Sequence, residues 1–109
     1  MKDKFTITAE ISVIPIRINN KSTGMSEEIA AVYDAIKEIK NTKITLTAMG
    51  TQIEAKNLEN ILEAVEISHK ILREKGITRI ISSIRIDERT DKYQTLNTKI
   101  NSVKQKLKK

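Results

Sequence analysis

The stretch KITLTAMGTQIEA, residues 43–55, decides the fold, because apolar and polar side chains alternate on both sides of a single glycine. Alternation with a period of two is typical of a half-buried strand. The stretch therefore predicts two short strands, at about 43–48 and 51–55, joined by a tight connection at Met49 and Gly50. Gly50 lacks the spacing of a phosphate-binding loop, so we interpret it as a turn residue.

A helix is predicted before this hairpin, over residues 26–40. Ser26 suits the N-cap position, and the carboxylates of Glu27 and Glu28 complement the positive end of the helix dipole. The helix is expected to end near Asn41. Its apolar residues recur at helical spacing, and they are Ile29, Val32, Tyr33, Ile36 and Ile39.

A second helix is predicted after the hairpin. Asn57 is expected to cap it, and Gly76 is expected to end it by taking the positive φ that glycine tolerates. The apolar face of this helix is formed by Leu58, Ile61, Leu62, Val65 and Leu72.

Two further strands complete the pattern. FTITAEISVI, residues 5–14, alternates strictly, and Pro15 marks its end or an edge irregularity because proline cannot donate to a ladder. TRIISSIRID, residues 78–87, alternates as well. The order β-α-β-β-α-β predicts an α+β, ferredoxin-like fold, in which two helices cover one face of a four-stranded antiparallel sheet.

A last helix is predicted at the C-terminus, where apolar residues recur at spacings of four, three and four. With two helices already on the sheet, this apolar face needs another partner. We therefore expect a homo-oligomer, most simply a tetramer built as a dimer of dimers. The face consists of Leu96, Ile100, Val103 and Leu107.

Length and composition limit the classes of protein. The chain of 109 residues suits one domain, residues 1–109, and it has no cysteine for a disulfide or a thiolate metal site. Its N-terminus, MKDKFTITAE, alternates and shows no signal-peptide pattern. We expect a soluble cytoplasmic protein without a membrane segment.

The positive charge is confined to one end of the chain. Residues 92–109 hold six of the 20 Lys and Arg residues and none of the 14 Asp and Glu residues. Acidic and basic residues balance in the rest of the chain, so the charge argues against a broad nucleic-acid surface. The three aromatic residues also offer few platforms on which bases could stack. We therefore expect no nucleic-acid partner, and the basic tail is the sole argument for that alternative.

The sheet face that the helices leave open is predicted to be polar in an unusual way. Hydroxyls are grouped there with carboxylates and a guanidinium, where a merely solvated sheet more often carries Lys and Glu. This face is expected to hold Thr8, Glu10, Ser12, Thr45, Thr47, Ser83, Arg85 and Asp87.

Individual charged residues admit two interpretations. Glu10 and Arg85 are expected on neighbouring strands, where they form either a cross-strand ion pair or part of a ligand site.

His69, at the edge of an apolar helix face, is interpreted as a packing residue. The acidic loop IDERTDK, residues 86–92, lacks the glycine and spacing of a calcium loop. No metal site, cofactor or catalytic constellation is predicted, so we expect a protein that is not an enzyme.

Four sequence blocks resemble the family of small thiamine-binding proteins, a YkoF-like group. The blocks are ITAEISVIPI (7–16), TAMGTQIE (47–54), AVEISHKILREKGITRIISSIRIDER (64–89) and the TDK that follows. The resemblance covers nearly the whole chain. It implies ferredoxin-like protomers that assemble through their sheets and C-terminal helices, and that bind thiamine or its hydroxymethylpyrimidine half for salvage or transport.

The resemblance and the polar sheet face together suggest which residues bind the ligand. An aminopyrimidine offers an NH₂ donor and ring-nitrogen acceptors, which a carboxylate, hydroxyls and an Arg would satisfy, while a thioether would supply an apolar contact. The expected ligand-binding residues are Glu10, Ser12, Thr47, Met49, Thr51, Glu54 and Arg85.

The alternative is a structural or regulatory assembly module that senses another small metabolite. Ferredoxin-like domains serve such functions too, and the fold does not choose among them. In that case the polar face would be an interface between subunits.

Overall fold

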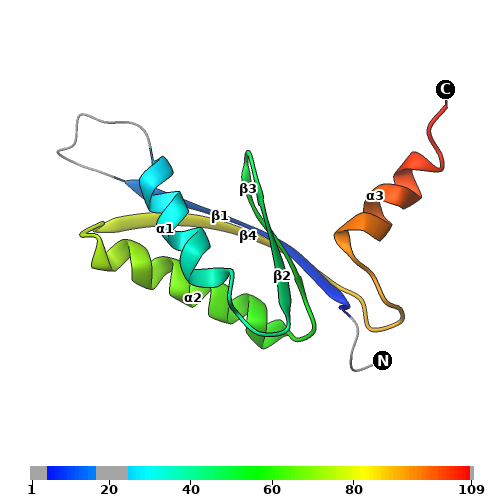
Figure 1. Ribbon diagram of the computed structural model, residues 1–109, viewed down its shortest axis with the longest axis horizontal. Coiled ribbons are helices and arrows are strands. Elements are labelled where there is room, and N and C mark those ends of the chain that lie inside the picture. The colour runs from blue at the N-terminus through cyan, green and yellow to red at the C-terminus, as the bar shows by residue number, and fades with distance from the viewer. Residues whose placement is uncertain (1–4, 17–24, 109) are drawn as a thin grey trace.

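The computed structural model describes residues 5–16 and 25–108 (Figure 1). The elements follow the order β-α-β-β-α-β with a third helix at the end, so the predicted fold class is confirmed. They are β1 (Ile7–Ile16), α1 (Ser26–Ile36), β2 (Thr42–Thr47), β3 (Gly50–Ala55), α2 (Leu58–Glu74), β4 (Arg79–Glu88) and α3 (Leu96–Lys104).

The four strands form one antiparallel sheet in the order β2-β3-β1-β4. The helices α1 and α2 lie together on one face of this sheet, whereas α3 projects beyond its end (Figure 1). In the part of the chain that the structure describes, no helix is long and apolar enough to cross a bilayer.

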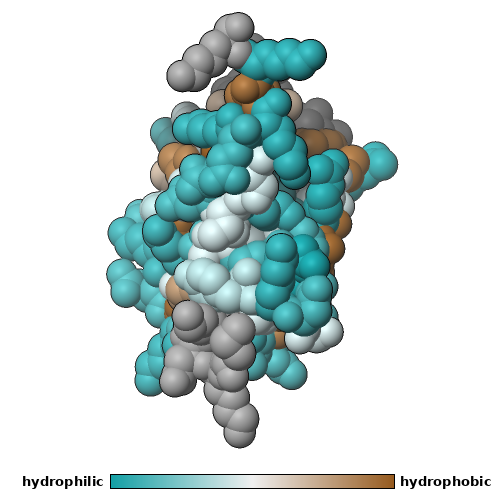
Figure 2. Space-filling model, turned by 90° about the vertical axis from the view of Figure 1, so that its right-hand side faces the viewer, coloured by the Kyte–Doolittle hydropathy of each residue, from teal (hydrophilic) through white to brown (hydrophobic). Residues whose placement is uncertain are grey.

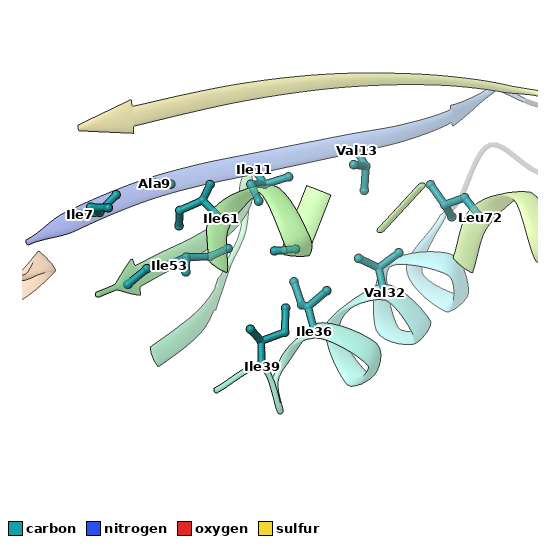
Figure 3. Close-up of a cluster of buried hydrophobic side chains, with 12 residues drawn as sticks. Ile7, Ala9, Ile11, Val13, Val32, Ile36, Ile39, Ile53, Ile61 and Leu72 are labelled. Atoms are coloured by element: carbon teal, nitrogen blue, oxygen red, sulfur yellow. The ribbon is translucent and has the colours of Figure 1, made fainter. Parts of the chain in front are cut away.

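The core lies between β1 and the two covering helices. The inward side chains of β1 point toward Ile61 and Leu72 of α2 and toward Ile36 of α1 (Figure 3). Ile53 of β3 is completely buried among them. The inward residues of β1 are Ile7, Ala9, Ile11 and Val13.

The helix predicted over 26–40 is shorter than expected. Met25 takes the N-cap position in place of Ser26, which is the first helical residue, and the helix ends at Ile36. The chain then turns, with the Ile39 amide donating to the Ile36 carbonyl at 3.1 Å, and Asn41 has a φ of 64°. That left-handed residue redirects the backbone into β2, while Ile39 stays in the core.

The ends of the second helix are confirmed, but its predicted apolar face is partly wrong. Asn57 is the N-cap, and Gly76, with a φ of 85°, follows the C-cap. Leu58 and Leu62 are exposed, because the buried face is rotated away from them. The buried residues of this helix are Ile61, Ala64, Ser68 and Leu72.

Gly50 is required by close packing and not by the turn. The hairpin strands pair up to Thr47 and Gly50, so the connection is made by Ala48 and Met49, one residue earlier than predicted. A Cβ on Gly50 would lie 3.2 Å from the Ile11 carbonyl oxygen and 3.3 Å from Cγ of Glu10. The glycine therefore lets β3 approach β1.

Pro15 lies inside β1, which continues two residues beyond the predicted end. From Ile7 to Ile11 the strand pairs with both β3 and β4, but from Ser12 onward it pairs with β4 alone. The proline is tolerated there because, among the described residues, one side of the strand has no neighbouring strand to which an amide would donate.

The helix α3 is attached to the sheet at its N-terminus. The Leu96 amide donates to Oε1 of the buried Glu54 at 2.7 Å, and Thr95 caps the helix by accepting from the Thr98 amide at 3.1 Å. Gln94, also buried, donates through Nε2 to the Asp87 carbonyl at 3.2 Å. The remainder of the helix projects away from the sheet, and the surface at this end is mostly hydrophilic, with hydrophobic residues toward its edges (Figure 2).

We predict that Ile53→Ala lowers the free energy of unfolding by about 2–5 kcal/mol, because it opens a cavity in a fully buried site. The matched control is Leu62→Ala, at a side chain that is 54% exposed. This substitution should change the free energy of unfolding by less than about 0.5 kcal/mol. Urea unfolding at one protein concentration measures both. Equal losses would contradict the assignment of the core.

We predict that Glu54→Ala loosens α3 while the sheet stays intact, because the charge-assisted bond to the Leu96 amide contributes roughly 1.5–3 kcal/mol. Amide hydrogen exchange should become faster over 96–99 and stay unchanged in β1. Glu59→Ala, at an exposed carboxylate on α2, is the control. Unchanged exchange over 96–99 in Glu54→Ala would show that the helix is held by other contacts.

Candidate functional site

A cavity of about 230 Å³ opens on the face of the sheet that α1 and α2 leave uncovered. Its floor is formed by β1, β3 and β4, and the first turn of α3 forms one wall. The predicted polar face therefore contains a concave site. The lining residues are Thr8, Ala9, Glu10, Gln52, Arg85, Asp87, Leu96 and Lys99.

Glu10 occupies the centre of this floor. Its neighbours in the sheet are Gln52 on β3 and Arg85 on β4. Gln52 donates through Nε2 to Oε2 of Glu10 at 3.2 Å. Among the described residues no ion pair within 4.0 Å joins Glu10 to Arg85, so the carboxylate is held by an amide and the exposed guanidinium faces solvent.

One wall of the cavity is an ion pair between the sheet and α3. Lys99 donates through Nζ to Oδ2 of Asp87. This bond lowers the pKa of the Asp87 carboxyl below its ordinary value of 3.8. The pair therefore supports the docking of α3 above that value, and its contribution is lost as the pH falls through the lowered pKa. Both side chains are more than 40% exposed, so solvent weakens the pair.

The cavity offers a mixed set of hydrogen-bonding groups. Glu10 and Asp87 are acceptors, Arg85 and Lys99 are donors, and Gln52 can do both. Such a set can hold a small polar molecule that carries donors and acceptors. Among the described residues, the lining includes no aromatic side chain that could stack on a ring.

The seven predicted ligand-binding residues do not converge on one place. Glu10 and Arg85 line the cavity described above. Glu54 instead faces the start of α3 and accepts from the Leu96 amide. The other four, Ser12, Thr47, Met49 and Thr51, line a second, smaller cavity.

The second cavity measures about 100 Å³ and lies between the β2–β3 hairpin and α1. It is mainly apolar. Thr51, expected as a ligand-binding residue, pairs with Ile11, an inward residue of β1, so it lies on the helix-covered face and away from Glu10 and Arg85. The remaining lining residues include Met25, Ile29, Val32 and Leu46.

The sequence analysis did not assign four lining residues of the cavity around Glu10 to the site, and they are Ala9, Gln52, Leu96 and Lys99. Leu96 and Lys99 belong to α3, which reaches the sheet through the loop at 89–95. The apolar face of α3 suggested a contact with another subunit, and no pattern links Lys99 to Asp87. The sequence contained one signal of the contact between α3 and the sheet. It was Glu54, a carboxylate on a strand, whose side chain is buried in the structure.

His69 lies on the other side of the sheet. Its Nε2 atom is 3.0 Å from Oγ of Ser82, so the half-buried imidazole links α2 to β4. Neither residue lines the two cavities described above. Within 5–16 and 25–108, no three His, Asp or Glu side chains are grouped so that they could hold a metal ion.

The sequence matches a family model described as thiamine-binding protein over residues 9–104. A UPF0045 protein of Methanothermobacter thermautotrophicus is 37% identical over 101 residues, which cover 93% of this chain and 99% of that protein. A UPF0045 protein of Bacillus subtilis is 31% identical over 100 residues, covering 91% of this chain and 95% of that protein.

Two solved structures are similar to this fold. A hypothetical protein of Methanocaldococcus jannaschii has a TM-score of 0.75 at 31% identity, over 91% of this chain and 96% of that one. A Thermotoga maritima protein described as a candidate for thiamine biosynthesis or salvage has a TM-score of 0.70 at 20% identity, over 90% and 98% of the two chains, which shows the fold alone. With the family model spanning nearly all of its length, the chain belongs to the thiamine-binding protein family.

Proposed function

We propose that this protein binds thiamine or its hydroxymethylpyrimidine precursor reversibly, without catalysis, in the cavity on the open face of the sheet. The observation that carries the proposal is the placement of Glu10 between Gln52 and Arg85 on the floor of that cavity. Membership of the thiamine-binding protein family supports the ligand class. The role would be salvage or transport in the cytoplasm.

The lining residues suit an aminopyrimidine. Its exocyclic NH₂ would donate to the Glu10 carboxylate, while its ring nitrogens would accept from Gln52 or Arg85. The thiazolium of thiamine is a cation, and the carboxylates of Glu10 and Asp87 would lower the cost of placing it nearby. This proposal needs no aromatic cage.

A binding role explains the lining better than a catalytic one. In the part of the chain that the structure describes, the cavity walls carry neither His nor Cys, and the only hydroxyl among them belongs to Thr8, which is 3% exposed. The His69–Ser82 pair lies on the helix-covered side of the sheet. The groups in the cavity can therefore orient a ligand, and we assign them no chemical step.

We predict micromolar binding of thiamine or hydroxymethylpyrimidine, which corresponds to about 8 kcal/mol. Glu10→Gln should weaken it by roughly 1–3 kcal/mol, because a charge-assisted bond is lost. Isothermal titration calorimetry measures both values. Glu74→Gln, at an exposed carboxylate at the end of α2, is the control and should bind like the wild type.

Two results would contradict this assignment. Folded wild-type protein that gives no heat with either compound at millimolar concentration would argue against the ligand class. Normal binding by Glu10→Gln would move the site away from this cavity, and the cavity at Thr47 and Met49 would then be tested by Thr47→Val.

We further propose that the protein works as a homo-oligomer, most simply a tetramer, in which α3 contacts another subunit. The apolar face of α3 is exposed in the protomer, since Ile100 is 50% and Val103 is 60% exposed. Leu107, just beyond the helix, is 65% exposed. Burying such side chains would contribute on the order of 1.5–3 kcal/mol each before entropy is subtracted.

We predict that Ile100→Asp with Val103→Asp lowers the mass measured by light scattering while the circular dichroism spectrum of the fold is retained. The reason is that two carboxylates would have to be desolvated in the contact. Asn97→Asp with Asn101→Asp adds the same charge to α3 at exposed polar positions and is the control. A wild-type protein that is monomeric at ~100 μM would exclude the proposed oligomer.

A further inference from the structure

The floor of the cavity on the open sheet face consists of two neighbouring rows of side chains. Each row runs across β3, β1 and β4, and the second row lies two residues along each strand from the first. Side chains two positions apart on a strand share a face and lie roughly 7 Å apart. A ligand with two linked rings would therefore span both rows. The first row is Gln52, Glu10 and Arg85, and the second row is Glu54, Thr8 and Asp87.

The first turn of α3 is bonded to both ends of the second row. The Leu96 amide donates to Oε1 of Glu54 at 2.7 Å. Lys99, three residues later and on the same side of the helix, donates through Nζ to Oδ2 of Asp87. As a result, Thr8 is only 3% and Glu54 only 4% exposed.

The first row is more open. Glu10 and Gln52 are half-buried, and Arg85 is exposed. Among the described residues, the hydrogen bonds from α3 to the sheet reach the second row and not Glu10. A single ring thus has access to the first row, whereas a second ring would meet α3.

Lys99 neutralises Asp87. Arg89, two residues further along the chain, is held by Asp91 through guanidinium–carboxylate bonds of 2.9 and 2.6 Å. Lys99 is therefore the one cation paired with Asp87 among the described residues. Both side chains of the pair are more than 40% exposed, so another cation can exchange with the ammonium.

The charges of the lining balance while Lys99 is in place. Two carboxylates, on Glu10 and Asp87, oppose the cations of Arg85 and Lys99. A thiazolium placed over the second row would meet the ammonium of Lys99, which is unfavourable between like charges. A neutral aminopyrimidine over the first row has no such opponent. The cavity volume of about 230 Å³ is also below the roughly 300–1,000 Å³ of sites that enclose drug-sized ligands.

We propose that Lys99 determines the specificity of the cavity by occupying the position that a cationic ring would need, so that the neutral hydroxymethylpyrimidine binds more tightly than thiamine. This inference rests on the function proposed above and chooses between its two ligands. Thiamine would reach the second row only when Lys99 leaves Asp87, and its thiazolium would then take the place of the ammonium. The helix α3 would stay attached, because the bond from the Leu96 amide to Glu54 does not involve Lys99.

Isothermal titration calorimetry with both compounds tests the proposal. A buffer at about pH 8 leaves the aminopyrimidine neutral while Lys99 stays charged and Asp87 ionised. The wild type should bind hydroxymethylpyrimidine about tenfold more tightly than thiamine. Lys99→Met keeps the apolar stem and removes the charge. It should improve thiamine binding about tenfold and change hydroxymethylpyrimidine binding by less than about twofold.

Two matched variants control for the charge and for its position. Lys104→Met removes the same charge from the last turn of α3, away from the cavity lining, and should leave the ratio of the two affinities unchanged. Lys99→Arg keeps a cation beside Asp87 and should keep the preference for hydroxymethylpyrimidine.

A double variant tests whether the thiazolium replaces the ammonium at Asp87. Adding Asp87→Asn to Lys99→Met should remove the gain in thiamine affinity, because the carboxylate that would receive the cation is lost. Thiamine binding that stays improved in the double variant would show that Asp87 is not the position in question and would overturn the proposal.

The remaining outcomes separate this inference from the proposed function. Wild-type protein that binds neither compound would overturn both. Wild-type protein that binds both, with thiamine equal or tighter, would overturn the inference and leave the proposed function standing. The same holds if Lys99→Met leaves the ratio unchanged, shifts both affinities equally, or acts no differently from Lys104→Met.

Discussion

The structure depends on the alternation of side chains along β1, an inner strand that pairs with β3 on one side and β4 on the other. Ile7, Ala9 and Ile11 point into the core, whereas Thr8 and Glu10 point to the open face. A slip of one residue would bury Glu10 under the helices and expose the isoleucines. The burial that stabilises the fold is therefore the same constraint that places the carboxylate in the cavity.

The order and type of the elements could be predicted because each depends on local patterns. Alternation identified the strands, and Asn57 and Gly76 marked the ends of α2 as observed. The errors arose where tertiary contacts decide. The end of α1 depends on the left-handed turn at Asn41, and Gly50 is required because β1 passes close to it. A short stretch of sequence reveals neither of these contacts.

Of the site, only the residues that lie on the strands of the sheet could be predicted. Register follows from alternation, so Glu10 and Arg85 were expected to be neighbours, and they are. Residues of the hairpin were assigned to the same ligand site from the resemblance and the polar sheet face, yet Thr51 is inward. The contribution of α3 could not be predicted, because it depends on Glu54 fixing Leu96 across a loop whose path the sequence leaves open.

Glu54 and Asp87 connect the cavity to the rest of the molecule in different ways. Glu54 is buried and accepts from the backbone, so it fixes the position of α3 with little dependence on salt. Asp87 is partly exposed and is bound by a flexible lysine, so its bond is weaker and can be shared with another cation. A ligand, a proton or a neighbouring subunit that alters the charge around Asp87 would therefore change the wall of the cavity without detaching α3, because the hydrogen bond at Glu54 holds the helix independently.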